Sequence, residues 1–141
     1  MNLRILDNHV SGTGYAGYVV PGHDCGESGS QQSFRGNTAN SIKGWGAIVF
    51  VNQKSFSQKT LCMEASYFTA YKCIEGGIMT YNGTLASTFS YMTLIDNHIG
   101  GTIMIGDEKN ENDTAVAIFS NSIFYGETDA RDCPAKDSCS H

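Results

Sequence analysis

Hydrophobic and polar residues recur in five segments of similar shape. Each segment has an anchor residue, an apolar residue three positions before it and an apolar or small residue two positions after it. The anchors are Asn8, Asn37, Tyr71, Asn97 and Asn121; the preceding residues are Ile5, Phe34, Phe68, Leu94 and Ile118, and the following ones are Val10, Ala39, Cys73, Ile99 and Ile123. Repetition at a spacing of roughly 20–50 residues is typical of stacked repeat architectures.

Each segment then reaches a glycine, at Gly17, Gly46, Gly77, Gly101 or Gly126. Four of these glycines open a short run of β-branched, aromatic and other apolar residues, which predicts a strand. The four predicted strands cover residues 18–20, 47–50, 78–81 and 102–105. The glycine before each run supplies a turn that a residue with a Cβ would resist.

The anchors lie 29, 34, 26 and 24 residues apart. We therefore predict an all-β chain that forms a right-handed parallel β-helix of about five coils. Residues 1–141 would be a single segment of a longer helix, and residues 21–33, 52–66 and 106–116 would be loops projecting from one side. A leucine-rich repeat is excluded because there is no leucine ladder, and a β-propeller needs longer blades. A β-sandwich remains the alternative fold, because it also consists of short strands separated by turns.

Four of the anchors are asparagines, and in stacked coils their side chains would form a ladder. Asn8, Asn37, Asn97 and Asn121 are the predicted members, and Tyr71 interrupts the series in the third coil. Asparagine tolerates the left-handed conformation that tight turns need, and its amide bonds to an equivalent amide one strand above or below. The alternative is that these residues are simply good turn formers.

Composition narrows the classes of partner. The chain has 141 residues, a net charge of -5, 16% charged residues, 16 glycines and only 2 prolines. Low charge disfavours disorder, and frequent glycine disfavours a coiled coil. The nine lysines and arginines are scattered, which leaves no basic stripe for nucleic acid. No apolar run is long enough to span a membrane, and the first residues are too polar for a signal peptide. If the protein is secreted, we expect this chain to be a fragment or to have lost its targeting segment.

The five cysteines fit no zinc-binding spacing. Cys25 and Cys62 lie in predicted loops of neighbouring coils, and we predict a disulfide between them. Cys73 occupies a core position and is predicted to be a buried thiol. Cys133 and Cys139 either close a small loop together or leave Cys139 to pair outside the chain. Glycosylation sequons at Asn82 and Asn112, together with the cysteines, favour an extracellular or lumenal location.

The sequence contains few candidate metal-binding or catalytic residues. Asp-Asn-His occurs at residues 7–9 and 96–98, in equivalent positions of coils one and four, so His9 and His98 would be too far apart to share a metal ion. The acidic stretch at residues 107–113 lacks the spacing of a calcium loop. Glycoside hydrolysis needs two neighbouring carboxyl groups, and no two adjacent coils carry them at one position. The sequence therefore predicts no catalytic residue, no metal site and no cofactor.

Several segments resemble a known family. The stretches DNHVSGTGYAGYVVPGHDC, SFRGNTANSIKGWGAIVF, LCMEASYFTAYKCIEGGIMTYNGT and YMTLIDNHIG are similar, in order, to segments of fibrocystin and fibrocystin-L. The resemblance extends from about Leu3 to Cys133. Tyr71 stands where the family has tryptophan, the acidic loop differs from the family's insertion, and Cys139 has no counterpart.

The resemblance implies a non-enzymatic segment of a large extracellular protein at the cell surface, including the ciliary membrane. Such a segment would act as a rigid spacer and a binding surface. Its partners would be other domains of the same protein, neighbouring chains or glycans, and it would meet the membrane only through a part outside this chain. Cys25, Cys62, Cys73 and Cys133 match cysteine positions of the family. The alternative is a module that binds or depolymerises a hyaluronan-like polysaccharide, as in more distant proteins with the same β-helix region.

Overall fold

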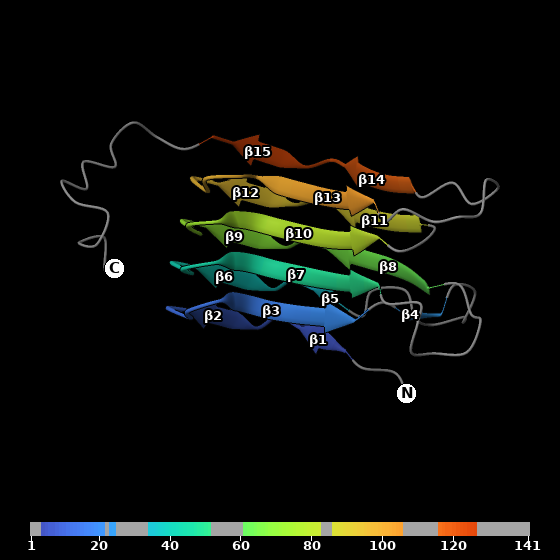
Figure 1. Cartoon of the computed structure of the whole chain (residues 1–141), viewed down its shortest axis with the longest axis horizontal. Coiled ribbons are helices and arrows are strands. Elements are labelled where there is room, and N and C mark those ends of the chain that lie inside the picture. Colours follow the sequence, from blue (N-terminus) through green and yellow to red (C-terminus); the bar gives the residue numbers. More distant parts are fainter. Residues whose placement is uncertain are drawn as a thin grey trace.

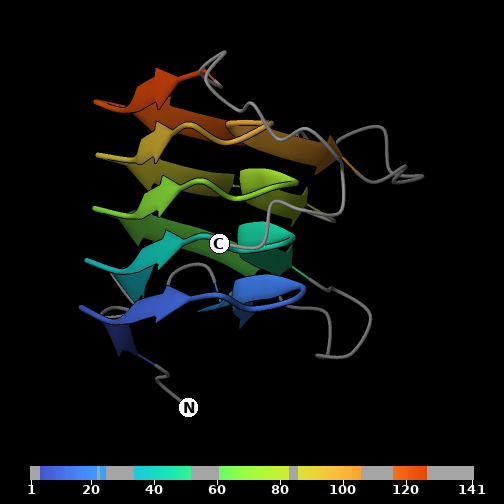
Figure 2. The same cartoon turned by 90° about the vertical axis from the view of Figure 1, so that its left-hand side faces the viewer.

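The structure is a computed structural model that describes residues 4–21, 23–24, 34–51, 61–82, 86–105 and 116–126. Every regular element in this part of the chain is a β-strand. Figure 1 shows the strands stacked in levels from the N-terminal to the C-terminal end of the described chain, and the same levels are visible after a 90° turn (Figure 2). The prediction of an all-β chain with parallel sheets is confirmed.

Three parallel sheets contain nearly all the strands. Sheet A consists of β1 (Ile5–Leu6), β5 (Phe34–Arg35), β8 (Leu61–Ser66), β11 (Ala86–Ser90) and β14 (Val116–Ser120). Sheet B consists of β2 (His9–Ser11), β6 (Thr38–Asn40), β9 (Thr69–Tyr71), β12 (Thr93–Ile95) and β15 (Ile123–Tyr125). Sheet C consists of β3 (Ala16–Pro21), β7 (Trp45–Val51), β10 (Gly76–Asn82) and β13 (Gly101–Ile105).

The chain visits sheets A, B and C in turn and then returns to sheet A beside the strand it left. We call each such passage a rung and number the rungs one to five from β1. In the described residues, rung five contains β14 and β15. This order of pairing is consistent with a β-solenoid.

The four strands predicted from glycine and an apolar run are confirmed as β3, β7, β10 and β13. The prediction of a loop over residues 52–66 is wrong at its C-terminal end, because residues 61–66 form β8, and the loop predicted over 106–116 overlaps the first residue of β14. Within the loop predicted over 21–33, β4 (His23–Asp24) pairs antiparallel with β8. It covers an edge of β8 that the two-residue strand β5 is too short to reach. Of the remaining residues of these loops, Pro21 ends β3 and the others lie outside the described part.

The core consists of columns of side chains from equivalent positions in successive rungs. In sheet A the column contains Ile5, Phe34, Ala65, Phe89 and Phe119. In sheet B it contains Val10, Ala39, Ala70, Leu94 and Phe124. Aromatic rings meet inside, with 5.3 Å between the centroids of Phe34 and Phe68 and 4.8 Å between those of Phe89 and Phe119. Members of the middle rungs are fully buried, so stacking removes their apolar surface from water.

Both corners that flank sheet B repeat one backbone conformation. Between sheets A and B, every rung has a residue with positive φ; these are Asp7, Gly36, Tyr67, Tyr91 and Asn121, with φ from 48° to 70°. Between sheets B and C the corresponding residues are Gly12, Ser41, Lys72 and Asp96, with φ from 51° to 68°. Only two of these nine residues are glycines, so the stacked fold imposes a left-handed turn on residues that disfavour it locally.

A column of glycines marks the start of sheet C. A Cβ on Gly17 would lie 2.6 Å from the carbonyl oxygen of Gly46. A Cβ on Gly46 would lie 2.6 Å from the carbonyl oxygen of Gly77, and a Cβ on Gly77 would lie 2.6 Å from that of Gly100. The predicted glycine positions in the first three rungs are therefore explained by close approach of backbones. In rung four the member is Gly100 rather than the predicted Gly101, because the corner before β13 is one residue shorter than the corner before β10.

Candidate functional surface

Two of the four predicted ladder asparagines are brought together. At the corner between sheets A and B, the backbone N–H of Asn8 donates to Oδ1 of Asn37 over 3.0 Å, and the Asn8 side-chain amide lies 3.3 Å from the same oxygen. The Asn37 amide donates to the carbonyl oxygen of Ile5 over 2.7 Å. The buried Asn37 side chain thus completes the turn of the rung below it.

Asn97 does the same at the other corner. Its Oδ1 accepts from the backbone N–H of Cys73 over 2.9 Å, and its amide donates to the carbonyl oxygen of Ala70 over 3.0 Å. In both cases the amide bridges a carbonyl and an N–H three residues apart in the rung below. The two asparagines are equivalent in chemistry but lie at different corners.

The predicted ladder of four asparagines is therefore corrected to one stacked pair. Asn97 lies at the corner between sheets B and C, and Asn121 is an exposed residue at a left-handed position, with φ 48°. Ser122 fills the inward position of that rung, and its hydroxyl accepts from the N–H of Met92 over 3.1 Å. Tyr71 lies at the end of β9, where it pairs with Asn40.

The two Asp-Asn-His sequences also lie at different corners, so their predicted equivalence is wrong. In each, the aspartate adopts the left-handed conformation, with φ 54° at Asp7 and 55° at Asp96. The next residue, asparagine, makes the bonds described above, and the histidine is exposed. Within the described residues, no group of three or more His, Cys, Asp or Glu side chains could hold a metal ion.

An exposed ladder runs along the corner between sheets A and B. The rings of Tyr67 and Tyr91 are stacked with 4.7 Å between centroids and 4° between planes. The guanidinium of Arg35 lies 5.1 Å from the centroid of the Tyr67 ring. All three side chains are exposed to solvent. We call this set the tyrosine ladder.

A column of threonines lies beside the tyrosine ladder in sheet B. Thr38, Thr69 and Thr93 are paired in register, and each comes two residues after the left-handed residue of its rung. Together the ladder and the column present hydroxyl groups, ring edges and one cation at the spacing of the strands, about 4.8 Å.

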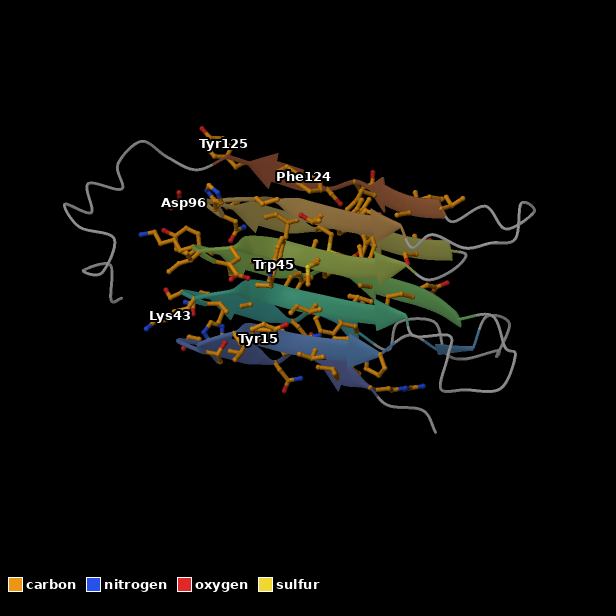
Figure 3. All side chains as sticks on the ribbon, in the orientation of Figure 1. Tyr15, Lys43, Trp45, Asp96, Phe124 and Tyr125 are labelled. Atoms are coloured by element: carbon orange, nitrogen blue, oxygen red, sulfur yellow. The ribbon has the colours of Figure 1, made fainter. Side chains whose placement is uncertain are left out.

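The corner between sheets B and C carries a different set of exposed side chains (Figure 3). Tyr15 and Lys43 are exposed there, and the Trp45 ring covers Gly76, whose missing Cβ leaves room for it. Lys72 Nζ lies 5.3 Å from the centroid of the Tyr71 ring. Inside the fold, the Tyr18 hydroxyl lies 2.9 Å from the carbonyl oxygen of Asn8 and 3.1 Å from that of Thr38, and burial raises the pKa of Tyr18.

The remaining predicted site residues are distributed as follows. Cys73 is a buried thiol, as expected from its core position. Cys62 lies in β8 opposite His23 of β4, which places the chain just before Cys25 beside it. Asn82 ends β10 between Val51 and Ile105. Cys25, Asn112, Cys133 and Cys139 lie outside the described residues, so the predicted disulfides and the Asn112 glycan stay predictions.

Comparison with family models, with curated proteins and with solved structures finds no match for this chain. Among the described residues, no helix has the length and apolar character needed to cross a membrane.

Proposed function

We propose that this chain is a right-handed parallel β-helix of about five coils, one segment of a longer helix. The cyclic order of the three parallel sheets supports it, and so do the two corners that repeat their backbone conformation in successive rungs. A solenoid of this kind resists bending, because each rung contacts its neighbours over its whole width.

Its function in this proposal is structural. The segment acts as a rigid, non-enzymatic spacer and contact surface in an extracellular protein at the cell surface, of the kind that the resemblance to fibrocystin implies. The observation that carries the proposal is the packing of the side chains at the exposed corner. Tyr67 has Arg35 over its ring and Tyr91 stacked against it, so its ring contributes to the ladder itself.

The same observation weighs against a sugar stacked on Tyr67. A sugar ring binds a tyrosine through the face of the aromatic ring. At Tyr67 a sugar would have to displace Tyr91 or Arg35. Contact with a protein partner through ring edges and hydroxyl groups needs no such displacement.

The test is secretion of the full chain from a eukaryotic cell behind a cleavable signal sequence, with three measurements. Enzymatic removal of N-glycans should lower its mass, and non-reducing peptide mapping should find Cys25 joined to Cys62. Incubation with hyaluronan or pectin should give no shorter products over a range of pH and calcium. Retention inside the cell without glycans would contradict the location, and appearance of shortened polysaccharide that Asp96→Ala abolishes would favour the enzymatic alternative.

A further inference from the structure

Sheet B and its two corners carry an excess of positive charge in rungs two to four, unlike the rest of the chain. The equivalent stretches of these rungs are residues 35–43, 66–74 and 90–98, and their lysine and arginine residues are Arg35, Lys43 and Lys72. Asp96 is the one acidic residue of the three stretches, and it is 5% exposed. Outside them the chain has six lysine and arginine residues and thirteen acidic residues. Positive charge gathered on one face of an acidic chain favours contact with an acidic partner.

Two of these cations lie against tyrosine rings of rung three, one before strand β9 and one at its end. The Arg35 guanidinium lies 5.1 Å from the centroid of the Tyr67 ring, and Lys72 Nζ lies 5.3 Å from the centroid of the Tyr71 ring. Thr69 lies between the two tyrosines along the chain, in β9, the middle strand of sheet B (Figure 1). We call Arg35, Tyr67, Thr69, Tyr71 and Lys72 the rung-three line.

The spacing of the two cation–tyrosine pairs matches an extended polypeptide. Tyr67 and Tyr71 are four residues apart, which is about 13 Å at the rise of a β-strand. Every second side chain of an extended polypeptide points the same way, so acidic residues four positions apart would reach both cations from one face. The residue midway between them would face Thr69, whose hydroxyl can donate and accept a hydrogen bond.

We propose that the rung-three line binds an extended segment of a partner protein that has two acidic residues four positions apart. One carboxylate pairs with Arg35 and the other with Lys72. Because each cation already lies against a tyrosine ring, it loses little further side-chain freedom on binding, which favours affinity. The inference rests on the proposed role of this chain as a contact surface and names the chemistry of the partner.

A polypeptide fits the rung-three line better than an acidic sugar chain does. A sugar ring stacks on the face of an aromatic ring. Arg35 and Tyr91 lie against the Tyr67 ring, and Lys72 lies against the Tyr71 ring. A carboxylate that approaches the cations and the hydroxyl groups from the solvent displaces none of these side chains.

Acidic residues beyond the rung-three line limit where an acidic segment can bind. Glu64 lies in β8 on the side of sheet A, and Glu75 follows Lys72 on the side of sheet C. Asp7 is exposed at the corner of rung one between sheets A and B. Like charges repel, so an acidic segment displaced in any of these directions binds more weakly.

The first test compares three short peptides, labelled with rhodamine, for binding to the full chain by fluorescence anisotropy in low salt and in roughly 0.15 M salt. The peptide TETVTET has glutamates four positions apart, TTEVETT has them two positions apart, and TQTVTQT has none. TETVTET should bind about fivefold more tightly than TTEVETT, because only one glutamate of the latter reaches a cation at a time. Its affinity should fall with salt, and TQTVTQT should not bind.

The second test measures TETVTET with variants of the chain in the higher salt. Arg35→Gln and Lys72→Gln should each weaken binding about fivefold, which is close to the largest effect of one exposed ion pair. The double variant should lose about 25-fold, because effects at sites this far apart add. Arg4→Gln removes an exposed cation that precedes β1, and as the matched control it should bind like the wild type.

Four outcomes would overturn the inference: no binding of TETVTET, equal binding of TTEVETT, equal weakening by Arg4→Gln, or tighter binding of oligogalacturonate that depends on Arg35 and Lys72. The last would identify an acidic sugar chain as the occupant. The peptide comparison uses the wild type, so it decides the matter even if a variant loses its strand spectrum in circular dichroism. Absence of peptide binding by a chain that is secreted with N-glycans would refute the acidic segment and leave the proposed spacer in place.

Discussion

Replacement of Asn97 by alanine tests whether the buried asparagines hold the corners together. Asn97 is buried, and so are Cys73 and Ala70, the residues whose backbone groups it bonds. In Asn97→Ala the N–H of Cys73 and the carbonyl of Ala70 lose their side-chain partner, with no solvent at hand to replace it. Each buried backbone group left unsatisfied costs about 1–3 kcal/mol. We therefore expect a loss of about 2–6 kcal/mol, a large part of the 5–15 kcal/mol typical of a folded domain.

Asn8→Ala is the matched control, since it makes the same chemical change at the open end of a stacked pair. The Asn8 side chain is exposed and donates to the carbonyl oxygen of Leu6 over 2.9 Å, where water can replace it. The expected loss is about 0.5–1 kcal/mol. A urea titration monitored by circular dichroism gives the unfolding midpoint of each variant. When the dependence of the unfolding free energy on urea has the same slope in both variants, the difference between the midpoints measures the difference in stability. Equal losses in the two variants would refute the assignment of a corner-bridging role to Asn97.

Further predictions concern the glycine column and one tyrosine. Gly46→Ala should destabilise by about 1–3 kcal/mol, because its Cβ would lie 2.6 Å from the carbonyl oxygen of Gly77, whereas Gly14→Ala, with no heavy atom within 4 Å, should be close to neutral in the same titration. Burial raises the pKa of Tyr18, so the folded state keeps the phenol proton longer than the unfolded state. The contribution of Tyr18 to the free energy of unfolding should be full below about pH 10 and should be lost as the pH rises further. Urea midpoints measured below and above pH 10 should therefore fall less in Tyr18→Phe than in the wild type.

The strands of sheet C were predictable because two local signals coincide there. A glycine needed for close approach of backbones comes directly before a run of apolar residues. Sheet A lacks such signals. β5 has two residues, and β11 reads Ala-Ser-Thr-Phe-Ser, in which Phe89 is the one large apolar side chain. Strands of this kind are stabilised by pairing with the rungs above and below, which a local sequence pattern does not contain.

The register of the asparagines could not be predicted for a related reason. Asparagine suits two different places in a rung, the left-handed residue itself and the inward residue that bridges to the rung below. Asn121 takes the first place, and Asn37 and Asn97 take the second. Because both places follow an apolar strand, the spacing to flanking hydrophobic residues does not separate them.

The tyrosine ladder was missed because its members break a local rule. A left-handed conformation costs a residue with a Cβ about 1–2 kcal/mol, so tyrosine is not an expected choice. In the fold, Tyr67 and Tyr91 have φ of 53° and 55° and stack on each other at 4.7 Å, which matches the strand spacing. An aromatic pair contributes about 0.5–1.5 kcal/mol beyond its buried area, and the guanidinium of Arg35 adds to it.

The corner and the contact surface therefore depend on each other. In rungs three and four the left-handed turn directs the tyrosine outward at the corner, where the two equivalent rings stack one strand spacing apart. In the middle of a sheet the same tyrosines would have no strain to offset and would face different neighbours. A partner that contacts this corner would meet Tyr67 and Tyr91 from the left-handed positions of rungs three and four, and Arg35 from the end of β5 in rung two, where the left-handed residue is Gly36. Insertion or deletion of a whole rung would change the number of side chains along this corner but not the spacing between them. A solenoid therefore changes length while the spacing of its surface side chains stays the same.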